Sequence, residues 1–364
     1  MPTLCNLFLV NWYARHPGFS FLETGVHMDY TVAMQRAITL AEKGLGKTAP
    51  NPIVGAVIID AFGALVGEGF HDRMNSPDHA ELVAIKATGE KSKGSTLVVS
   101  LEPCNHSGAT APCTKAIIDA GISSVVYAMR DPNMKAAGGA DALRAAGVNV
   151  ISGVLEKEAA FSNRAWLMKM KKNRPFFTWK VATTLDAKVA ASDGTSKWIT
   201  NESSRADVQT LRRQADAIVV GTNTVIADNP HLIPRGEFPG FTRNPIRVIC
   251  GEQDLPSDAH IFDDDAQSVV VKTKDLDILV EKLNELGLNH VLVEAGPTLA
   301  SAMVDHCLMD ELVIYQAPTL LGSGKPFFCF DYPSTIAGQM RLEHMSTQIL
   351  DGDIKSTYRI GNGE

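Results

Sequence analysis

The sequence predicts an α/β fold in two consecutive domains. Short aliphatic runs that are typical of buried strands alternate along the chain with segments of helical periodicity. The 364 residues are enough for about two domains of ordinary size. A charged segment, residues 156–175, separates two blocks of this alternation. We therefore predict one domain over residues 28–172 and a second over residues 173–364.

Residues 1–27 differ in composition from the blocks that follow. They contain prolines, glycines and Trp12 but show neither a helical nor a strand period. Their short apolar run has no basic segment before it and no small-residue cleavage pattern after it, so a signal peptide is not expected. We expect an N-terminal extension without ordered structure. It is either a stretch upstream of the true start codon or a disordered arm.

The first block opens with a helix over residues 28–44, because apolar residues recur on one face and Gly44 ends the pattern. Strands are expected after it at residues 53–60, 65–71, 95–104, 123–129 and 149–155. Helices are expected between them at residues 79–88, 113–121 and 141–148. The segment 156–175 is expected to be one connecting helix that ends at Asn173, Arg174 and Pro175.

The second block repeats the alternation of strand and helix, with no internal sequence repeat. Its strands are expected at residues 176–186, 216–221, 245–250, 268–273, 290–296 and 311–318. Its helices are expected at residues 203–215, 275–287 and 297–308. The last helix begins at Pro297, and proline is favoured at the first position of a helix.

Composition and charge exclude several classes of function. Lys and Arg number 34 and Asp and Glu number 41, which gives a net charge of −7. Proteins that coat nucleic acid depend on Lys and Arg to neutralise phosphates, so nucleic acid is not an expected partner. No run approaches the ~18 consecutive apolar residues of a membrane helix, so no membrane association is expected. A pocket for one small phosphorylated molecule is compatible with this composition.

The six cysteines are too sparse for a secreted disulfide scaffold. We expect them to be free thiols or metal ligands. Both states require a reducing compartment, so the sequence predicts a cytoplasmic protein.

The strongest chemical signal lies between residues 79 and 113. His79, Cys104 and Cys113 supply one imidazole and two thiolates, which are good zinc ligands. Three strong ligands leave the fourth tetrahedral position open for water, and an open zinc lowers the pKa of that water to about 7. Glu81 is placed to carry protons between this water and an amino leaving group. The pattern H-x-E, followed by P-C and a second Cys, is the signature of zinc deaminases.

Two other interpretations of this cluster stay open. His71 or His106 would close the site as a fourth ligand and make the zinc structural, or the residue types occur together by coincidence. Eight residues separate Cys104 from Cys113, where deaminases of free cytidine or nucleic acid typically have about two. This spacing argues against those relatives.

The second block lacks the G-x-G-x-x-G sequence of a dinucleotide-binding fold. Its candidate for an anionic group is the segment 290–300, where a buried strand ends at Glu294, Gly296 allows a tight turn and Pro297 begins a helix. Backbone N–H groups at such a helix start bind phosphates. The alternative is a plain strand–turn–helix packing unit.

Together these motifs resemble the bifunctional deaminase and reductase family of riboflavin biosynthesis. The matching segments of the first block are TAPNPIVGAVI (48–58), GEGFH (67–71), HAELVA (79–84), SLEPCNHSGATAPC (100–113) and DPN (131–133). The matching segments of the second block are RPFFTWKVATTLDAKVA (174–190), SKWIT (196–200), ADAIVVGTNTVIADNPHL (215–232) and VEAGPTLA (293–300).

The resemblance implies a fold and a reaction for each domain. The first would be a three-layer domain of the cytidine-deaminase type. With one catalytic zinc, it would remove the 2-amino group of 2,5-diamino-6-ribosylamino-4(3H)-pyrimidinone 5′-phosphate as ammonia. The second would resemble dihydrofolate reductase and reduce the ribosyl group to ribityl with NADPH. The resemblance also implies a homo-oligomer, in the form of a dimer through the reductase domain.

The family's motifs also imply the residues of the sites. The cofactor would contact Ala182, Trp198, Thr224, Asp228, Gly296, Pro297, Thr298, Leu299, Ala300, Ser301 and Ala302. The substrate would contact Asn51 in the first domain and Ser196, Arg212, Leu232, Arg235 and Glu294 in the second. Arg212 and Arg235 suit the substrate phosphate, because a guanidinium binds phosphate oxygens through two parallel N–H groups. Their alternative is a solvated surface position, and for Asn51 the alternative is an ordinary Asn-Pro turn.

Two departures from the family pattern concern the reductase domain. Ala187 stands where the family has glycine, which matters if that backbone position requires a positive φ. Glu252 falls where a small polar residue would suit the 2′-phosphate of NADPH, and a carboxylate would repel it. A deaminase with an altered or inactive reductase domain is therefore the alternative function. A zinc-stabilised scaffold, with a fourth protein ligand and no turnover, is the alternative from another class.

Overall fold

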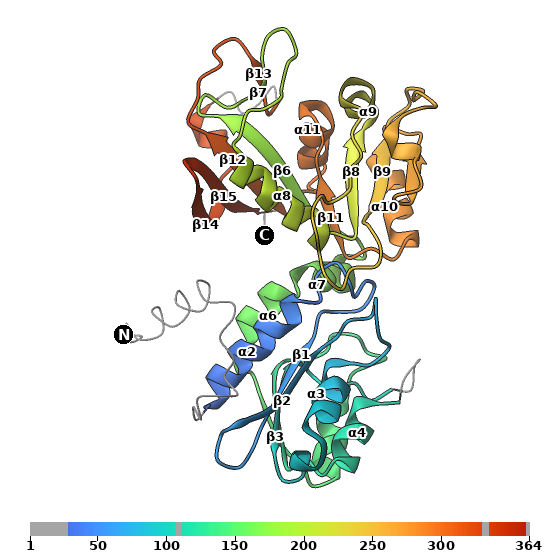
Figure 1. Ribbon diagram of the computed structural model, residues 1–364, viewed down its shortest axis with the longest axis vertical. Helices are drawn as coiled ribbons and strands as arrows, with labels where there is room; N and C mark the ends of the chain where they lie inside the picture. Colours follow the sequence, from blue (N-terminus) through green and yellow to red (C-terminus); the bar gives the residue numbers. More distant parts are fainter. Residues whose placement is uncertain (1–27, 107–110, 330–334, 362–364) are drawn as a thin grey trace. The chain divides into compact units, whose positions relative to one another are not determined.

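The computed structural model describes residues 28–106, 111–329 and 335–361 (Figure 1). The extension expected at residues 1–27 lies outside these ranges. The described chain divides into two compact units. Within the described residues, the first unit comprises residues 28–41, 54–71 and 78–159, and the second comprises residues 42–53, 72–77 and 160–361.

The first unit is built on a five-stranded sheet in the order β2–β1–β3–β4–β5. The strands are β1 (Gly55–Ile59), β2 (Leu65–Phe70), β3 (Thr96–Leu101), β4 (Ser124–Met129) and β5 (Asn149–Ser152). β1 is antiparallel to β2 and β3, whereas β3, β4 and β5 are parallel. The helices are α2 (Tyr30–Glu42), α3 (Ala80–Thr88), α4 (Cys113–Asp119) and α5 (Gly139–Ala145), with a 3₁₀ turn η2 (Gly89–Ser92). Each of these strands and α-helices is expected from the sequence.

Glycines let helices α2 and α3 pack directly on this sheet. A Cβ on Gly55 in β1 would lie 2.0 Å from the backbone oxygen of Ala37 in α2. A Cβ on Gly69 in β2 would lie 2.7 Å from the backbone nitrogen of Ala84 in α3. Gly69 pairs with Ala56, the neighbour of Gly55, and successive residues of a strand face opposite sides. The two helices therefore cover opposite faces, which confirms a three-layer unit (Figure 1).

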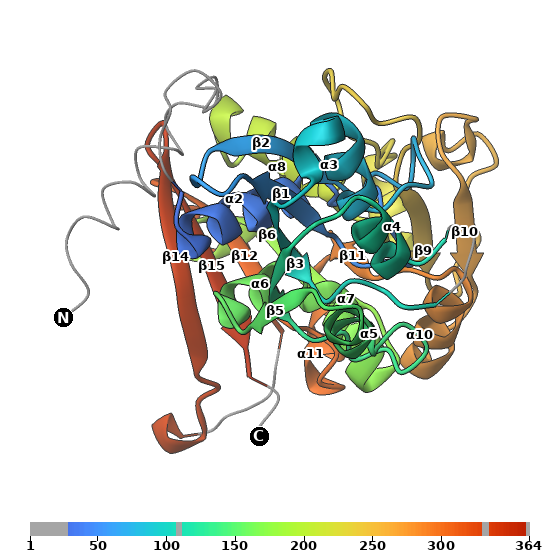
Figure 2. The same cartoon turned by 90° about the horizontal axis from the view of Figure 1, so that it is seen from below.

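The second unit contains an eight-stranded sheet in the order β10–β9–β8–β11–β6–β12–β15–β14. Its strands are β6 (Phe176–Thr184), β8 (Ala217–Gly221), β9 (Ile246–Cys250), β10 (Ser268–Val271), β11 (His290–Val293), β12 (Glu311–Ala317), β14 (Leu342–Leu350) and β15 (Asp353–Ile360). The first six strands in this order, which end with β12, are parallel to one another. β15 and β14 are antiparallel and form the long red hairpin of Figure 2. A separate antiparallel pair consists of β7 (Lys188–Ala190) and β13 (Lys325–Pro326).

Helices cover both faces of the eight-stranded sheet. They are α7 (Arg164–Lys172), α8 (Glu202–Gln214), α9 (Thr222–Asp228), α10 (Leu276–Glu285) and α11 (Pro297–Asp305), with 3₁₀ turns η3 (His260–Phe262) and η4 (Ile336–Gly338). Leu279 of α10 and Met303 of α11 are buried in one core cluster with Val219 of β8. Val225 of α9 is buried in a second cluster with Ile218 of β8. Because Ile218 and Val219 face opposite sides of β8, the two clusters lie on opposite faces.

The carboxyl ends of three neighbouring parallel strands meet at one edge of this sheet. Thr222, Gly251 and Glu294 follow β8, β9 and β11 directly, and β8 lies between the other two. Ligands of open parallel sheets bind at this edge. The fold therefore brings the segment after each strand toward one possible site.

The segment 156–175, expected to be one helix, is two helices. α6 (Glu156–Ser162) and α7 are separated by Asn163. The Asn163 side chain bonds both backbone groups of Ile53: its Oδ1 accepts from the nitrogen at 3.0 Å, and its Nδ2 donates to the oxygen at 2.9 Å. This long-range pairing holds Asn163 in a cap conformation, so the expectation of a continuous helix was wrong.

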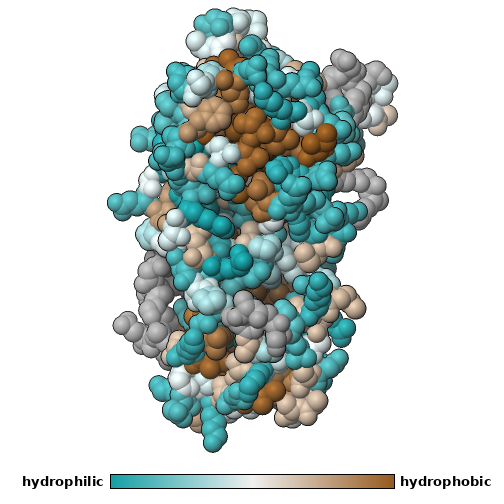
Figure 3. Space-filling model, turned by 90° about the vertical axis from the view of Figure 1, so that its right-hand side faces the viewer, coloured by the Kyte–Doolittle hydropathy of each residue, from teal (hydrophilic) through white to brown (hydrophobic). Residues whose placement is uncertain are grey.

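At the β10 edge of the sheet, the surface of the second unit carries both hydrophobic and hydrophilic residues (Figure 3). Ser268, Val269 and Val270 of this edge strand are half-buried. Figure 3 views the side at which β10 and α10 lie and shows hydrophobic residues gathered on the second unit among hydrophilic ones. In the described ranges, no helix has both the length and the apolar character needed to cross a bilayer.

Candidate functional site

His79, Cys104 and Cys113 converge in the first unit. Their ligand atoms all lie within 4.8 Å of one another. His79 Nδ1 is 3.2 Å from Cys113 Sγ and 3.6 Å from Cys104 Sγ. Zinc bonds of about 2.0–2.3 Å in a tetrahedron place ligand atoms roughly 3.5–3.8 Å apart, so the three residues suit a single zinc ion. Within the described ranges, no other His, Cys, Asp or Glu joins this group.

Local chain geometry explains the convergence. His79 is the N-cap of α3, and Cys113 is the first residue of α4. Cys104 follows β3 in a turn that begins at Pro103. Helix α5 closes on this turn at Gly139, where a Cβ would lie 1.8 Å from the backbone oxygen of Pro103. Glycine at position 139 therefore lets α5 support the turn that carries Cys104.

The ligand side chains are electrostatically coupled. Hydrogen bonds from Cys113 and His79 lower the pKa of Cys104 to about 4, although burial opposes the shift. The hydrogen bond to Cys104 and burial together raise the pKa of Cys113. The hydrogen bond with Cys104 also raises the pKa of His79. A thiolate is thus favoured at Cys104, and thiolates are the form in which cysteine binds metals.

Glu81 lies in the first turn of α3, beside the ligand cluster, and is only 3% exposed. Burial raises the pKa of its carboxyl, and the neighbouring Cys104 raises it further. A buried carboxyl with a raised pKa is suited to accept a proton and return it during a reaction. This is the role that the sequence predicts for Glu81.

His71, which the sequence left open as a fourth ligand, is held by its own loop. Its ring is 3% exposed, and its Nδ1 donates to the Asp78 carbonyl at 3.0 Å. The ring packs edge-on against His79, with ring centroids 5.0 Å apart. Such packing orients the imidazole ligand without adding a ligand atom. His106 is exposed and does not belong to the cluster that the described residues form.

A second polar cluster lies in the second unit, at the carboxyl end of β11. Arg212 of α8 binds the Glu294 carboxylate twice, from Nε to Oε1 at 2.6 Å and from Nη2 to Oε2 at 2.9 Å. Lys180 Nζ of β6 lies 4.0 Å from the same carboxylate. Burial would raise the pKa of Glu294, but Arg212 and Lys180 outweigh it and hold that pKa at about 2. Arg235 acts on Glu294 in the same direction.

Lys180 is the residue of this cluster that sequence analysis missed. Its side chain is 17% exposed, and burial lowers the pKa of its ammonium against the opposing effect of Glu294. Its signal is a single charge within the otherwise uncharged strand FFTWKVATT. Because a buried charge is costly, a lysine in such a strand indicates a specific partner or a reaction.

Helix α11 begins three residues after Glu294. Gly296 is its N-cap and Pro297 its first residue. A Cβ on Gly296 would meet no atom within 4 Å, so the space at this helix start is open. The first N–H groups of a helix have no partner within it, and they suit an anion such as a cofactor pyrophosphate. Ala300 and Ser301 are buried behind this turn, and Ser301 Oγ accepts from the Cys329 nitrogen at 3.0 Å.

Two family models match the chain. Residues 28–129 match the cytidine and deoxycytidylate deaminase zinc-binding region, and residues 175–356 match the RibD C-terminal domain. The riboflavin biosynthesis protein RibD of Mycobacterium tuberculosis is 43% identical over 292 residues, which are 80% of this chain and 85% of that protein. The chain belongs to the RibD family. Escherichia coli RibD is 38% identical over 330 residues, 81% of this chain and 89% of the relative.

Solved RibD structures have the same fold. Acinetobacter baumannii RibD superposes with a TM-score of 0.85 at 36% identity, covering 92% of this chain and 99% of that one. The Thermotoga maritima diaminohydroxyphosphoribosylaminopyrimidine deaminase/5-amino-6-(5-phosphoribosylamino)uracil reductase gives 0.83 at 34% identity, covering 91% and 99%. As a RibD family member with both domains, the chain is a bifunctional deaminase and reductase of riboflavin biosynthesis.

The other predicted cofactor and substrate residues of this RibD family member come from three segments of the second unit. Ala182 lies half-buried in β6. Ser196 and Trp198 lie between β7 and α8, with Trp198 64% exposed. Thr224 and Asp228 lie in α9. Their contacts with a cofactor or substrate stay predictions.

Leu232 is a special case among the predicted substrate residues. Its side chain is 2% exposed and belongs to the core cluster of Ile218, Val220 and Val225. Its φ of 51° places it in the left-handed region. Only its backbone is therefore available to a substrate.

Asn51 belongs to the segment 42–53, which groups with the second unit. It follows a cis peptide bond between Ala49 and Pro50, and its carbonyl accepts from Asn289 Nδ2 at 3.1 Å. Its expected contact with the substrate of the deaminase stays a prediction.

The two departures from the family pattern have different surroundings. Ala187 has a φ of 60°, so the position does favour glycine. Glu252, 57% exposed, pairs with Lys274, whose Nζ lies 2.8 Å from Glu252 Oε2. Glu252 raises the pKa of the Lys274 ammonium. A positive charge thus accompanies the carboxylate that was expected to repel a 2′-phosphate.

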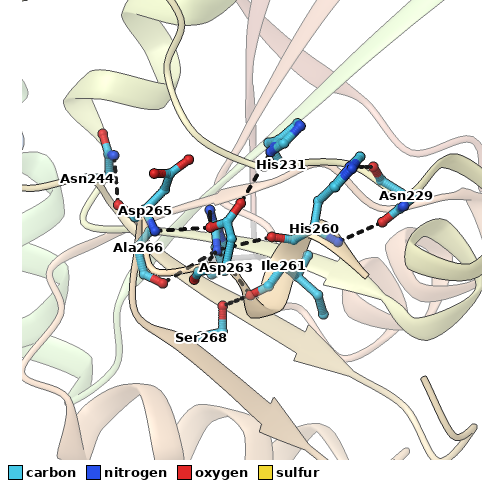
Figure 4. A network of polar contacts seen from close by, with 10 residues as sticks. Asn229, His231, Asn244, His260, Ile261, Asp263, Asp265, Ala266 and Ser268 are labelled. Atoms are coloured by element: carbon cyan, nitrogen blue, oxygen red, sulfur yellow. Dashed lines mark hydrogen bonds and ion pairs between the residues drawn. The ribbon is translucent and has the colours of Figure 1, made fainter. Parts of the chain in front are cut away.

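A second group of possible metal ligands consists of His231, Asp263 and Asp265, which are exposed (Figure 4). Asp263 Oδ1, however, accepts from the buried Arg247 Nη2 at 2.7 Å and from the Asp265 nitrogen at 3.0 Å. The guanidinium neutralises this carboxylate. One of the group's two carboxylates is therefore already paired, which weakens the group as a metal site.

Proposed function

We propose that the first unit deaminates 2,5-diamino-6-ribosylamino-4(3H)-pyrimidinone 5′-phosphate and that the second reduces the ribosyl group of the product to ribityl with NADPH. The name of the Thermotoga maritima relative gives it a deaminase and a reductase activity on compounds of this class. The observation that carries the proposal is the cluster of His79, Cys104 and Cys113 with buried Glu81 beside it.

For the deaminase, His79, Cys104 and Cys113 would hold zinc, whose chemistry when bound is to lower the pKa of water. Their donor set of one imidazole and two thiolates suits zinc better than magnesium or calcium. Glu81 would take a proton from the attacking water and give it to the amino group that leaves as ammonia. Its burial and raised pKa support this exchange.

For the reductase, NADPH would supply the hydride, and the residues of the second unit would position the sugar phosphate. Arg235 has an exposed side chain and would bind the phosphate. Arg212 uses Nε and Nη2 on Glu294 and Nη1 on the Ile233 oxygen. These bonds involve three of its five N–H donors, so Arg212 is able to bind both Glu294 and the substrate.

The backbone at the start of α11 would hold the cofactor's pyrophosphate. Gly296, Pro297, Thr298 and Leu299 lie at this turn, and Gly296 leaves it open. Ala300, Ser301 and Ala302 would support this turn from within α11, because the Ala300 nitrogen already donates to the Gly296 oxygen at 3.2 Å. At the ends of β9 and β10, Lys274 would offer the positive charge that a 2′-phosphate requires, which supports NADPH over NADH in spite of Glu252.

We also propose a homodimer through the second unit and a location in the cytoplasm. β14 ends the eight-stranded sheet, most of its residues are exposed, and Ile349 is 74% exposed. Such an edge is suited to pair with a second copy. Two thiol ligands require a compartment where cysteine stays reduced. Sedimentation equilibrium of the purified protein tests the homodimer.

The test of the proposed function is a two-stage assay with the Glu81→Gln variant. Without cofactor, the wild-type protein should release ammonia from the diaminopyrimidinone phosphate, and added NADPH should then be oxidised. Glu81→Gln should lower the rate of ammonia release by about 10²–10⁴-fold, because it removes the proton carrier. It should keep zinc and should still oxidise NADPH when it receives the deaminated substrate.

Each outcome separates the two halves of the proposal. Unchanged ammonia release by Glu81→Gln would contradict the role of Glu81, and loss of zinc would show a structural role instead. Ammonia release without oxidation of NADPH or NADH would contradict the reductase half alone. No ammonia release from folded, zinc-loaded wild-type protein would contradict the deaminase half.

A further inference from the structure

We propose that His260 is a positioning residue of the reductase site, which holds in place the loop that presents Arg235 to the ribosyl phosphate. The loop, called here the Asn229–Arg235 loop, runs from the end of α9 to Arg235. The inference rests on the proposed function of the second unit. No motif of the sequence points to His260, which lies in η3 more than twenty residues further along the chain.

The far end of the Asn229–Arg235 loop is attached to the substrate cluster. The Arg235 nitrogen donates to Gln209 Oε1 of α8 at 3.0 Å. The Ile233 oxygen accepts from Arg212 Nη1 at 3.3 Å, and Arg212 in turn binds Glu294. The position of this loop therefore determines where the charges of Arg235 and Arg212 lie relative to the substrate.

The near end of the loop is held by His260 (Figure 4). The His260 nitrogen donates to Asn229 Oδ1 at 2.8 Å, and its ring Nδ1 donates to the Asn229 oxygen at 2.8 Å. The ring also stacks on His231, with centroids 4.0 Å apart and an angle of 8° between the rings. One exposed histidine thus contacts both Asn229 and His231 of the loop.

His260 is itself held from the core of the sheet. Arg247 of β9 is 0% exposed, and its Nη1 donates to the Ile261 oxygen at 3.0 Å. Its Nη2 donates to Asp263 Oδ1 at 2.7 Å, while Asp263 Oδ2 lies 3.3 Å from His231 Nδ1. A buried arginine thus fixes the segment that carries His260. Together, the contacts of Arg247 with this segment and of His260 with Asn229 connect β9 to the Asn229–Arg235 loop.

The two contacts of the His260 ring are separable by substitution. His260→Phe keeps an aromatic ring for stacking on His231 but removes the donor to the Asn229 oxygen. His260→Asn removes the ring, and its side-chain amide restores a donor close to the position of Nδ1. If the hydrogen bond positions the loop, His260→Phe should impair the reductase and His260→Asn should restore most of its function. Asp264→Asn, at an exposed position of the same segment, is the matched control.

The test measures the reductase KM for the deaminated ribosyl phosphate, the KM for NADPH and kcat on the full chain. His260→Phe should raise the substrate KM by about fivefold to tenfold, the effect of losing one hydrogen bond. The KM for NADPH and kcat should stay within about twofold, because the loop acts on substrate binding. Hydrogen exchange of the peptide that covers residues 229–236 should accelerate by about tenfold in the same variant.

Other results would overturn the proposal. Faster exchange of the loop with an unchanged substrate KM would show that His260 holds the loop for stability only. An equal rise of both KM values would place its effect at the cofactor. If His260→Phe also lost ammonia release, the variant would be misfolded. The substrate KM of His260→Asn would then decide whether the hydrogen bond positions the loop. Wild-type protein that does not oxidise NADPH would contradict the proposed function, whereas slow exchange in that protein would still show the anchored loop.

Discussion

Ala187 lies in the turn between β6 and β7 with a φ of 60°. A side chain in this region costs about 1–2 kcal/mol, because Cβ approaches the carbonyl oxygen. Glycine removes this cost but loses more entropy on folding, by about 0.5–1 kcal/mol. We expect Ala187→Gly to increase the free energy of unfolding of the second unit by about 0.5–1 kcal/mol. Urea denaturation followed by tryptophan fluorescence measures this, since Trp166, Trp179 and Trp198 belong to that unit.

A matched substitution tests whether φ is the cause. Ala206 is exposed within α8, where φ is helical. Ala206→Gly should lower the free energy of unfolding by about 1 kcal/mol. If Ala187→Gly raises the free energy of unfolding and Ala206→Gly lowers it, the result supports backbone strain at Ala187. A loss of stability in Ala187→Gly would contradict it.

Glu294 links stability to pH. Its pKa is about 2 in the folded protein, against 4.5 for an ordinary glutamate, because Arg212 and Lys180 outweigh burial. A lowered pKa stabilises the folded state above pH 4.5, and this stabilisation is lost as pH falls from 4.5 towards 2. It amounts to about 3 kcal/mol at neutral pH. Glu294→Gln should therefore destabilise the second unit at pH 7 and have little effect near pH 2.

Denaturation midpoints of both proteins across this pH range provide the measurement. The difference between wild type and Glu294→Gln isolates this carboxyl from the others that titrate with it. A difference that stays constant from pH 7 to pH 2 would show that the ion pairs of Glu294 contribute no net stability.

At the scale of residues, the sequence predicted which three possible metal ligands converge but not the surroundings of the reductase residues. His79, Cys104 and Cys113 are chemically distinctive and follow regular elements, so their convergence follows from local geometry. The burial of Leu232 depends on contacts with β8 and α9. The partner of Lys180 is Glu294, which follows β11. Contacts between distant segments have no signal in one sequence.

At the scale of elements, strands and helices with buried faces were predicted, whereas exposed and short elements were missed. α9 has seven residues, too few for a clear helical period. β14 is mostly exposed and mixes polar residues with Leu and Ile, so it lacks the alternation of a half-buried strand. Its position is fixed by pairing with β15. Pairing partners of this kind are visible only in the folded chain.

The contact of α5 with the Cys104 turn leads to a prediction at this scale. A methyl group on Gly139 would clash with the backbone oxygen of Pro103, 1.8 Å away. Neither backbone can move without shifting Cys104 or α5. Gly139→Ala should therefore destabilise the first unit by about 1–3 kcal/mol and weaken zinc binding. Competition with a chromogenic chelator measures the affinity for zinc.

The control for Gly139→Ala is Ala145→Ser at the exposed end of α5. It should leave both zinc affinity and ammonia release unchanged. Gly139→Ala with wild-type zinc affinity would show that the turn tolerates displacement, and the support that α5 gives to Cys104 would be disproved.

At the scale of the molecule, two compact units each contain their own sheet. The cluster of His79, Cys104 and Cys113 lies wholly in the first unit, and the Arg212–Glu294 cluster lies wholly in the second. Chain length and two blocks of strand–helix alternation predicted two domains, but the segments that each unit comprises depend on long-range contacts. One example is the bond of 3.1 Å from Asn289 Nδ2 to the Asn51 oxygen, which joins residues far apart in the sequence.

Separate clusters predict separate responses to metal removal. Dialysis against a zinc chelator should abolish ammonia release, because it removes the ion that His79, Cys104 and Cys113 would hold and that would lower the pKa of the attacking water. Oxidation of NADPH with the deaminated substrate should continue at the rate of the untreated protein. Added zinc should restore ammonia release. Loss of both activities on chelation, with recovery of both on zinc addition, would contradict independent sites.

The same experiment also tests which cluster binds metal. We expect one zinc per chain by elemental analysis, because Arg247 neutralises Asp263 in the group of His231, Asp263 and Asp265. His79→Ala should reduce zinc to well below one per chain. Two zinc ions per chain, with one retained in His79→Ala, would show that the exposed group binds metal after all. Asp263 would then exchange its bond with Arg247 for the ion, which would also release the segment that holds His260.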